Sequence, residues 1–401
     1  MLIKLAFKNV WRNKRRTLFT ELAIVFGVLI IVFTGSFLKG MGQDWALDLI
    51  NTTTGAFQVE HKDFLEKSKS EPMEVSLSNS DTIIREIESI PGIISASGQL
   101  KISGMISTGT KATTFNGMGI DIEKHSKTLY KAENLIISGR AIGADPSEIV
   151  IGQLLAEVLG AQIGDQLTLV VKNYNGMYDM MYAKLVGIKH GNHFPSATYV
   201  EMHLSQAQNL LRMKNKVSQV LVRADKFANI LSYKEIAQSK LGKLAVPFVV
   251  RDYTELIEMY NTIRPAFRVT GIVVSIVLFI IVGGGIASAM FMAVRERKKE
   301  IGTILAIGME RSQIRNLFIM EGVATGLIGV IIGTCAAFAV ITILELSGGI
   351  RFSKTMATTP IIDWLTVSYA VVMSIIVSII ASWSPASLSS KLDPVTALTE
   401  N

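Results

Sequence analysis

Long apolar runs are the strongest feature of the hydrophobic and polar pattern. The almost wholly apolar stretches are residues 18–38, 269–293, 317–344 and 361–383. Each is long enough to cross a bilayer, because a spanning helix needs about 20 consecutive apolar residues. The pattern therefore predicts an α-helical membrane protein with four transmembrane helices.

The first apolar run could also belong to a signal peptide, since basic residues precede it. The run is longer than the apolar region of a typical signal peptide, and no small-residue cleavage site follows it. We therefore expect it to be an uncleaved membrane anchor.

A long stretch of soluble character separates the first and second apolar runs. An amphipathic helix is expected to begin at the N-cap Asp81 and to stop at Pro91-Gly92. The Gly164-Asp165 pair is a turn signal. β-Branched and alternating residues predict strands at 148–151, 167–171 and 217–222. The mixture predicts an inserted α+β extracytoplasmic domain.

Lysine and arginine gather beside two of the apolar runs. The bases before the first run, with no acid among them, are Lys4, Lys8, Arg12, Lys14, Arg15 and Arg16. The bases after the second run are Arg295, Arg297, Lys298, Lys299, Arg311 and Arg315. Because bases that flank spans remain in the cytoplasm, both termini are predicted to be cytoplasmic and the large insert to face outward.

The chain is thereby divided into nine predicted segments. They are an amphipathic interfacial helix at 1–17, transmembrane helices at 18–39, 267–293, 314–345 and 361–384, an outside α+β domain at 40–266, a cytoplasmic loop at 294–313, an outside loop at 346–360 and a cytoplasmic tail at 385–401.

Composition narrows the classes of function. The 401 residues are 49% hydrophobic and carry a formal charge of +7. Nucleic acid is not expected as a partner, because the bases lie beside apolar runs where anionic lipid headgroups account for them. The single cysteine, Cys335, excludes an intramolecular disulfide.

Two short motifs imitate nucleotide-binding sequences. Residues 104–113 hold the glycines and lysine of a phosphate loop, but Thr110 separates Gly109 from Lys111, and a hairpin turn is expected instead. Residues 346–349, Leu-Ser-Gly-Gly, match the centre of an ABC ATPase signature but lie in the predicted outside loop, where a tight turn is expected. We predict no catalytic or cofactor-binding residue in this chain, so that ATP would be bound by a partner subunit.

His190 and His193 have the spacing of a pair of metal ligands in a loop. No third ligand lies near them in the sequence, and a metal site normally needs at least three. We therefore expect exposed loop histidines and no metal site.

The segment after the second run has the pattern of a short helix. Charged residues open it, and Ile301, Ile304 and Leu305 share one helical face. Such a helix could dock in a groove of a cytoplasmic subunit or could rest on lipid alone. The pattern by itself leaves both possibilities open.

This segment resembles a known family. The run Glu-Arg-Lys-Lys-Glu-Ile-Gly at 296–302, Ala-Ile-Gly at 306–308 and Glu-Gly at 321–322 resembles the cytoplasmic loop of the MacB/FtsX-type ABC transporter permeases. Residues 391–398, Lys-Leu-Asp-Pro-Val-Thr-Ala-Leu, resemble the closing motif of that family. The segments at 117–121, 149–156 and 164–165 are most similar to those of its lipoprotein-releasing permeases, LolC and LolE.

The resemblance implies a MacB-like periplasmic core domain, a location in the cell inner membrane and ATPase-driven work. The residues expected to couple to the ATPase are Glu296, Arg297, Glu300, Ile301, Gly302 and Leu305. The implied partners are a cytoplasmic ABC ATPase dimer, a second permease in a homodimer or heterodimer, a lipoprotein substrate and a periplasmic carrier or adaptor.

The same resemblance leaves other functions open. One is efflux of antibiotics or peptides through an adaptor and an outer-membrane duct, as in MacB-like pumps. Another is regulation of cell-wall hydrolases without transport, as in FtsX-like proteins. In each of these functions the chain would be a membrane subunit and no enzyme.

Polar and small residues inside the spans predict helix contacts. Glu21 and Glu321 are expected to snorkel or to pair with Arg15, Arg16 or Arg315 near the cytoplasmic ends. Small residues spaced four apart in the second span predict close approach of another helix or a dimer face. They are Gly283 with Ala287, Gly284 with Ser288, and Gly285.

Overall fold

The computed structural model describes residues 14–67, 73–190, 199–242, 247–256, 258–351 and 357–392. It separates into two compact units, which we treat one at a time. The membrane unit is Met1–Asp44 with Ile263–Asn401, and the inserted unit is Trp45–Thr262.

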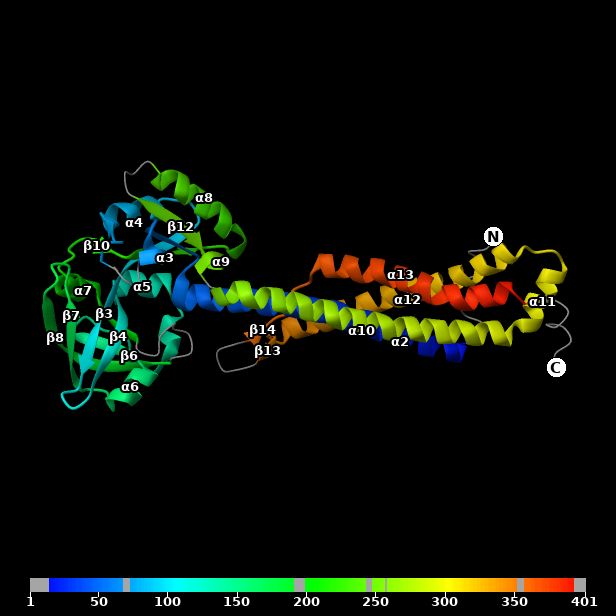
Figure 1. Ribbon diagram of the computed structural model, residues 1–401, viewed down its shortest axis with the longest axis horizontal. Helices are drawn as coiled ribbons and strands as arrows, with labels where there is room; N and C mark the ends of the chain where they lie inside the picture. The colour runs from blue at the N-terminus through cyan, green and yellow to red at the C-terminus, as the bar shows by residue number, and fades with distance from the viewer. Residues whose placement is uncertain are drawn as a thin grey trace. The chain divides into compact units, whose positions relative to one another are not determined.

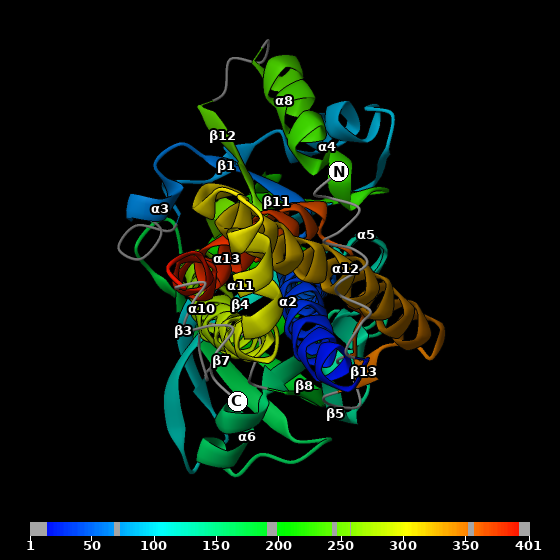
Figure 2. The same cartoon turned by 90° about the vertical axis from the view of Figure 1, so that its right-hand side faces the viewer.

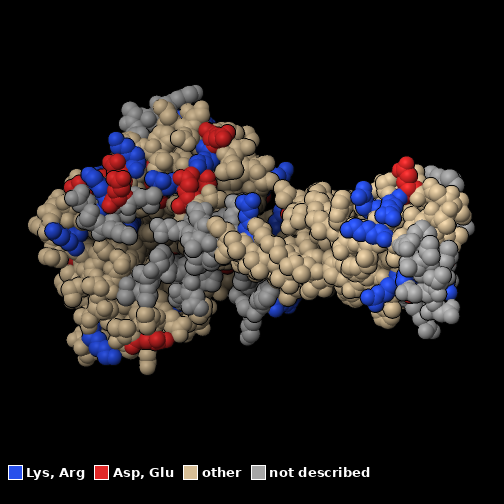
Figure 3. Space-filling view, turned by 45° about the vertical axis from the view of Figure 1, so that its right-hand side comes forward, with Lys and Arg blue, Asp and Glu red and all other residues tan. Residues whose placement is uncertain are grey.

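The membrane unit is a bundle of long helices (Figure 1). Its helices are α2 (Lys14–Leu49), α10 (Glu258–Glu296), α12 (Arg311–Leu346), α13 (Trp364–Ser390) and the short α11 (Lys298–Ala306). Four of them are long and apolar enough to cross a membrane, in agreement with the four predicted spans. Figure 3 shows a long stretch of this bundle without charged side chains, and lysines and arginines gathered at one end.

Several helices extend beyond the apolar runs from which they were predicted. α2 continues to Leu49 and passes into a π-helix at Ile50–Thr54, while α10 begins at Glu258 and contains Pro265. The apolar pattern marks only the part of a helix that lies in lipid, whereas backbone hydrogen bonds continue into polar sequence until a breaker intervenes.

The loop between α12 and α13 is fixed to α2 within the membrane unit. It contains the hairpin of β13 (Ile350–Arg351) and β14 (Ala357–Thr358). The Thr359 amide donates to Asp44 Oδ2 at 3.1 Å, the Ile361 amide donates to the Ser36 carbonyl at 3.0 Å, and Lys39 Nζ lies 2.8 Å from Asp363 Oδ1. These bonds fix the position of the α13 N-terminus on α2.

The inserted unit is built on a ten-stranded mixed sheet. Its strands are β1 (Phe57–His61), β3 (Ile93–Ser107), β4 (Ala112–Ile120), β5 (Ile136–Gly139), β6 (Glu148–Gly152), β7 (Gln166–Lys172), β8 (Tyr178–Lys189), β9 (Tyr199–His203), β11 (Gln219–Ala224) and β12 (Phe248–Asp252). A separate pair consists of β2 (Leu77–Ser78) and β10 (Lys216–Val217).

Helices cover this sheet (Figures 1 and 2). They are α3 (Phe64–Lys67), α4 (Ser80–Glu88), α5 (Ile122–Thr128), α6 (Gln153–Leu159), α7 (Leu204–Leu211), α8 (Ile230–Leu241) and α9 (Tyr253–Leu256), with 3-10 turns at Ala132–Leu135 and Phe227–Asn229.

Six strands close into a ring. β3 pairs with β4, and the pairing continues through β9, β6, β8 and β7 back to β3. One apolar core lies against these strands and the helices α6 and α7, and includes Ile102, Phe115, Leu155 and Leu169. A second core gathers Phe57, Ile84 and Val220 from β1, α4 and β11 with residues of α8. The unit therefore has an α+β fold with two cores, as its mixed pattern predicts.

Most of the expected local elements are present, with two corrections. Strands β6 and β7 and the turn at Gly164 (φ +101°) lie where they were predicted. The predicted strand at 217–222 is divided between β10 and β11, because Ser218 leaves the pairing and its amide donates to the Gln99 carbonyl. The predicted N-cap Asp81 is wrong, since α4 begins at Ser80 after Asn79.

Both imitations of nucleotide motifs are turns, as expected. β3 and β4 form a hairpin whose turn holds Gly109 at φ +90°, and the Thr108 amide donates to the Lys111 carbonyl. Gly348 and Gly349 have φ of +83° and +79° at the end of α12. Such left-handed backbone favours glycine, which explains why glycine occupies these three positions.

Candidate functional site

The candidate site is the junction of α10, α11 and α12, which we call the α11 junction (Figure 1). α10 ends at Glu296, Arg297 leaves helical geometry at φ −105°, and α11 begins at Lys298. The φ of +99° at Gly308 reverses the chain before α12. The expected short helix after the second span is therefore present, and it crosses the end of the bundle.

The apolar face of α11 packs on the bundle. Ile301 is buried at 4% exposure, Gly302 is buried, and Leu305 is half-buried. Ile301, Ile304 and Leu305 belong to the same apolar cluster as Phe318 of α12. These side chains hold α11 against the ends of the spans.

A buried ion pair joins the start of α11 to α12. Arg297 Nη1 lies 3.0 Å from Glu321 Oε2, and the two side chains are 10% and 3% exposed. The Thr325 hydroxyl donates to the Glu321 carbonyl at 2.9 Å. The pair crosses from one helix to another and fixes the angle at which the chain turns from α10 into α11.

Of the three expected partners of Glu321, Arg315 is not paired with it. Arg315 lies six residues before Glu321 on α12, which places the two side chains about 120° apart around the helix. The Arg315 guanidinium instead lies 5.4 Å from the centre of the Trp383 ring. The side chains of Arg15 and Arg16, the other expected partners of Glu21 and Glu321, are outside the described residues, as are the interfacial segment 1–13 and the closing motif from residue 393.

The outer face of the α11 junction presents charged and apolar groups to solvent. Glu296 and Glu300 are exposed, and so is Lys299. Ile307, directly after α11, is 82% exposed. Of the residues expected to couple to an ATPase, the structure therefore places Glu296 and Glu300 on the surface, and Arg297, Ile301 and Gly302 inside. Ile307 was recognised only as part of the Ala-Ile-Gly motif at 306–308 and was not among the residues expected to couple to the ATPase.

The expected small-residue stripe of the second span is divided among three environments. A Cβ atom at Gly283 would lie 3.2 Å from Val377 of α13, and one at Gly285 would lie 3.9 Å from Ala23 of α2. Gly284 has no neighbour within 4 Å, and Ser288 is exposed. Gly283, Gly284 and Ala287 line an apolar groove of about 450 Å³ between α10 and α13.

A second small-residue contact was missed by sequence reasoning. On α13, Ser374, Ser378 and Ser382 are buried at four-residue spacing and face α12. A Cβ atom at Gly322 would overlap Ser382, and one at Gly326 would overlap Ser378. The serine spacing was the available signal, because small residues four apart allow two helices to approach closely.

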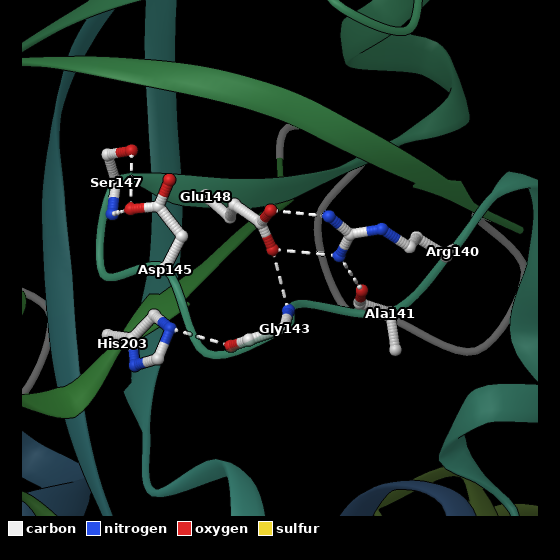
Figure 4. Close-up of polar contacts among 7 residues, drawn as sticks. All are labelled: Arg140, Ala141, Gly143, Asp145, Ser147, Glu148 and His203. Carbon is white, nitrogen blue, oxygen red and sulfur yellow. Dashed lines mark hydrogen bonds and ion pairs between the residues drawn. The ribbon is translucent and has the colours of Figure 1, made fainter.

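The inserted unit holds a polar cluster around Glu148 (Figure 4). Arg140 binds both carboxylate oxygens of Glu148, and the Gly143 amide donates to Oε2 at 2.7 Å. The Arg140 hydrogen bond lowers the pKa of Glu148 to about 2. His203 Nε2 lies 3.0 Å from the Gly143 carbonyl. Because these groups bind one another, the cluster fixes the loop before β6.

A second polar group lies deeper in the inserted unit. Lys189 Nζ lies 2.6 Å from Glu201 Oε1, and the Tyr199 hydroxyl donates to the same oxygen at 3.1 Å. The Gln99 amide donates to His125 Nδ1 at 3.1 Å. Burial lowers the pKa of His125 to about 4, which keeps the imidazole neutral near neutral pH.

The two histidines considered as metal ligands are not brought together with other ligands in the described structure. His190 Nδ1 lies 3.4 Å from Gln153 Oε1, and His193 lies outside the described residues. Among the described residues, no group of three histidine, cysteine, aspartate or glutamate side chains could hold a metal ion.

Two family models match the chain. The FtsX-like permease C-terminal model matches residues 272–394, and the MacB-like periplasmic core domain model matches residues 17–239, which is more than half of the chain. The chain belongs to the MacB/FtsX-type ABC transporter permease family. As a permease of this family, it is the membrane part of an ABC transporter, its inserted unit is a MacB-like periplasmic domain, and the family implies a cytoplasmic ATPase partner.

The relatives of this permease include proteins named for lipoprotein release and for macrolide export. It is 21% identical to the lipoprotein-releasing system transmembrane protein LolE of Haemophilus influenzae, over 96% of this chain and 94% of that protein. It is 22% identical to the macrolide export ATP-binding/permease protein MacB of Psychrobacter cryohalolentis, over 99% of this chain but only 59% of that protein. Among solved structures, the periplasmic region of MacB from Actinobacillus actinomycetemcomitans is similar with a TM-score of 0.38 and 14% identity, over 52% of this chain and 93% of that one.

Proposed function

We propose that this permease releases lipoproteins from the outer leaflet of the inner membrane, with energy from a separate ATPase dimer that binds ATP. The observation that carries the proposal is the match to LolE, a lipoprotein-releasing transmembrane protein, along 94% of that relative. The chain spans 59% of the MacB relative named above.

The α11 junction would be the point at which the ATPase acts. Glu296, Glu300 and Ile307 present the exposed surface, while Ile301 and the Arg297–Glu321 pair transmit movement to the spans. A short helix with exposed acids, followed by an exposed apolar side chain, suits insertion in a groove of a partner protein. In this proposal both termini are cytoplasmic, and the permease itself performs no covalent chemistry.

A second permease copy or homologue would complete the path in lipid. Gly284 and Ser288 are open to the outside of the bundle and allow close approach of another helix. The apolar spans would accept acyl chains, and the inserted domain would transfer the protein part to a soluble carrier.

Reconstitution tests this function. The permease, its second permease and the ATPase are placed in proteoliposomes with a lipidated protein and a soluble acceptor. We expect ATP-dependent transfer of the lipidated protein to the acceptor. A control protein, in which a transmembrane helix replaces the lipid as the membrane anchor, should not be transferred. An intact, ATP-hydrolysing complex that transfers neither would contradict the proposal.

Efflux of antibiotics or peptides is the second candidate, because MacB relatives match 99% of the chain. Deletion in the native cell separates the two functions. Mislocalised lipoproteins with unchanged drug susceptibility support release, whereas drug sensitivity with normal lipoprotein localisation supports efflux.

A further inference from the structure

The outer surface of the strand ring carries an apolar patch where β3, β7 and β8 lie side by side. Met105 pairs with Val170, and Val170 pairs with Met180, so the three residues form one row across the strands. Tyr178 and Tyr182 lie two residues on either side of Met180 and therefore share its face. We call these five residues the β8 patch.

The large side chains of the β8 patch face water. Met105 is 53% exposed, Met180 58%, Tyr182 64% and Tyr178 75%. The alternate residues on the same strands, such as Leu169 and Ala183, are buried in the core. The strands therefore already have a packed inner face, and an outer face in water is ordinarily polar. A contiguous exposed apolar surface of this kind marks an interaction site.

The border of the patch is basic. Lys172 lies opposite Tyr178 on β7, and Lys184 follows Tyr182 on the same face of β8; both are exposed. The outward positions of β3, β4, β7 and β8, all of them described, include no aspartate or glutamate. The acids beside the patch are paired with arginines: Asp179, on the other face of β8, with Arg212, and Glu148, opposite Lys184, with Arg140.

We infer that the β8 patch is a docking surface for a water-soluble protein that presents an apolar centre bordered by acidic side chains. Methionine and tyrosine are enriched at the centres of protein interfaces. Lysines at the border attract an acidic partner and speed its association. The inference is independent of which cargo the transporter moves.

Two other occupants fit the surface less well. In a symmetric pair of copies, the lysines of one patch would face those of the other, which is repulsive. An anionic membrane is typically bound by clusters of four to eight bases, and the patch has only Lys172 and Lys184 at its border. A soluble acidic protein satisfies both the apolar centre and the basic border.

Site-specific photocrosslinking tests the inference in the full chain in its native cell. The photoreactive residue p-benzoylphenylalanine replaces Met180 in one strain and Leu231 of α8 in the control strain. Leu231 matches Met180 in exposure at 58% and lies on the same unit, outside the patch. We expect Met180, but not Leu231, to form an adduct with an acidic soluble protein, identified by mass spectrometry.

Charge reversal then tests the chemistry of the contact. With Lys172→Glu and Lys184→Glu, the adduct yield should fall at least about fivefold at equal amounts of permease in the membrane. Binding of the purified partner to the detergent-solubilised full chain should weaken about tenfold between about 0.05 M and about 0.5 M salt. Tyr182→Ser, which changes the apolar centre without changing charge, should also reduce binding.

The inference is overturned by any of four results. They are an adduct with a second copy of the chain, an adduct with lipid alone, an adduct whose yield does not change on lysine reversal, and the absence of any Met180 adduct beyond the Leu231 control.

Discussion

At the scale of single residues, the Arg297–Glu321 pair is a buried ion pair between the start of α11 and α12. A buried ion pair gains little over an apolar pair, but removal of one partner leaves an uncompensated charge and costs roughly 3–5 kcal/mol. Such a pair therefore favours a specific geometry more than it adds stability. Here the geometry is the turn from α10 into α11.

Glu321→Ala should destabilise the membrane unit by about 3 kcal/mol, because Arg297 stays buried without its carboxylate. The measurement is the free energy of unfolding in detergent micelles. Glu300→Ala is the matched control, since Glu300 is exposed and its loss should change the stability by less than about 0.5 kcal/mol. Equal stability of the two variants would contradict the structural role of the pair.

His125 should make the inserted unit sensitive to mild acid. Burial lowers the pKa of His125 to about 4 from an ordinary value of about 6.5; the charges of Glu201 and Asp121 oppose this shift, and that of Lys189 reinforces it. The folded unit thus binds fewer protons than the unfolded chain between these values. The stability associated with neutral, buried His125 is fully present above about pH 6.5. Up to about 3 kcal/mol of this stability is lost as the pH falls towards about 4.

The check is amide hydrogen exchange of β3 and α5 at each pH, compared between the wild type and His125→Gln. The glutamine keeps a hydrogen-bonding side chain but does not titrate. The difference in protection between the two proteins should shrink by about 2–3 kcal/mol from pH 7 to pH 4. A difference that stays constant with pH would refute this assignment.

Sequence reasoning at this scale identified which residues matter better than which residues they touch. It expected Glu321 to snorkel or to pair with Arg15, Arg16 or Arg315 and did not name Arg297, because the contact between the start of α11 and α12 cannot be seen in a linear pattern. It placed an N-cap at Asp81, whereas α4 begins one residue earlier, after Asn79 in left-handed geometry (φ +57°). Tertiary contacts decided both cases.

At the scale of elements, the α12–α13 contact depends on the absence of side chains. Gly326→Leu should force the two helices apart, because its side chain would overlap Ser378 of α13. We expect a fall in thermal stability in detergent, and partial recovery when Ser378→Gly is added. Recovery shows that overlap, and not loss of glycine as such, causes the effect.

Gly284→Leu is the matched control on α10, where a side chain has no neighbour within 4 Å. The isolated chain should keep its stability, but association with a second permease should weaken if Gly284 lies in that interface. Destabilisation of the isolated chain equal to that of Gly326→Leu would contradict the packing described here.

The elements themselves were largely predictable. Apolar length determined the four spans, and β-branched alternation determined β6 and β7, because these signals are local. The closure of six strands into a ring was not predictable, since it depends on pairings such as β3 with β7 between residues far apart in the chain. The serine stripe of α13 was readable in principle and was overlooked.

At the scale of the whole molecule, the family assignment makes both units parts of one ABC transporter permease, and the family implies a cytoplasmic ATPase as its partner. The α11 junction was predicted as the point of contact with the ATPase, and the residues predicted for it differ in burial. Ile301 and Gly302 face the bundle, and Ile307 is the large apolar side chain of this region that faces solvent at 82% exposure. The helical pattern that predicted this segment ends at Leu305, two residues before Ile307. It could therefore not show that the Ile307 side chain is exposed.

The central claim is that ATPase movement enters through the α11 junction and drives lipoprotein release. The most direct test is the rate of ATP-dependent release from proteoliposomes by complexes that carry wild-type permease, Ile307→Asp or Leu346→Asp. Leu346 is the matched control, because it is 84% exposed and lies at the far end of α12. We predict wild-type release, near wild-type release with Leu346→Asp, and at least about a tenfold loss with Ile307→Asp, the size of about 1.4 kcal/mol. Release by Ile307→Asp at the wild-type rate, or no release by an intact wild-type complex, would contradict the account.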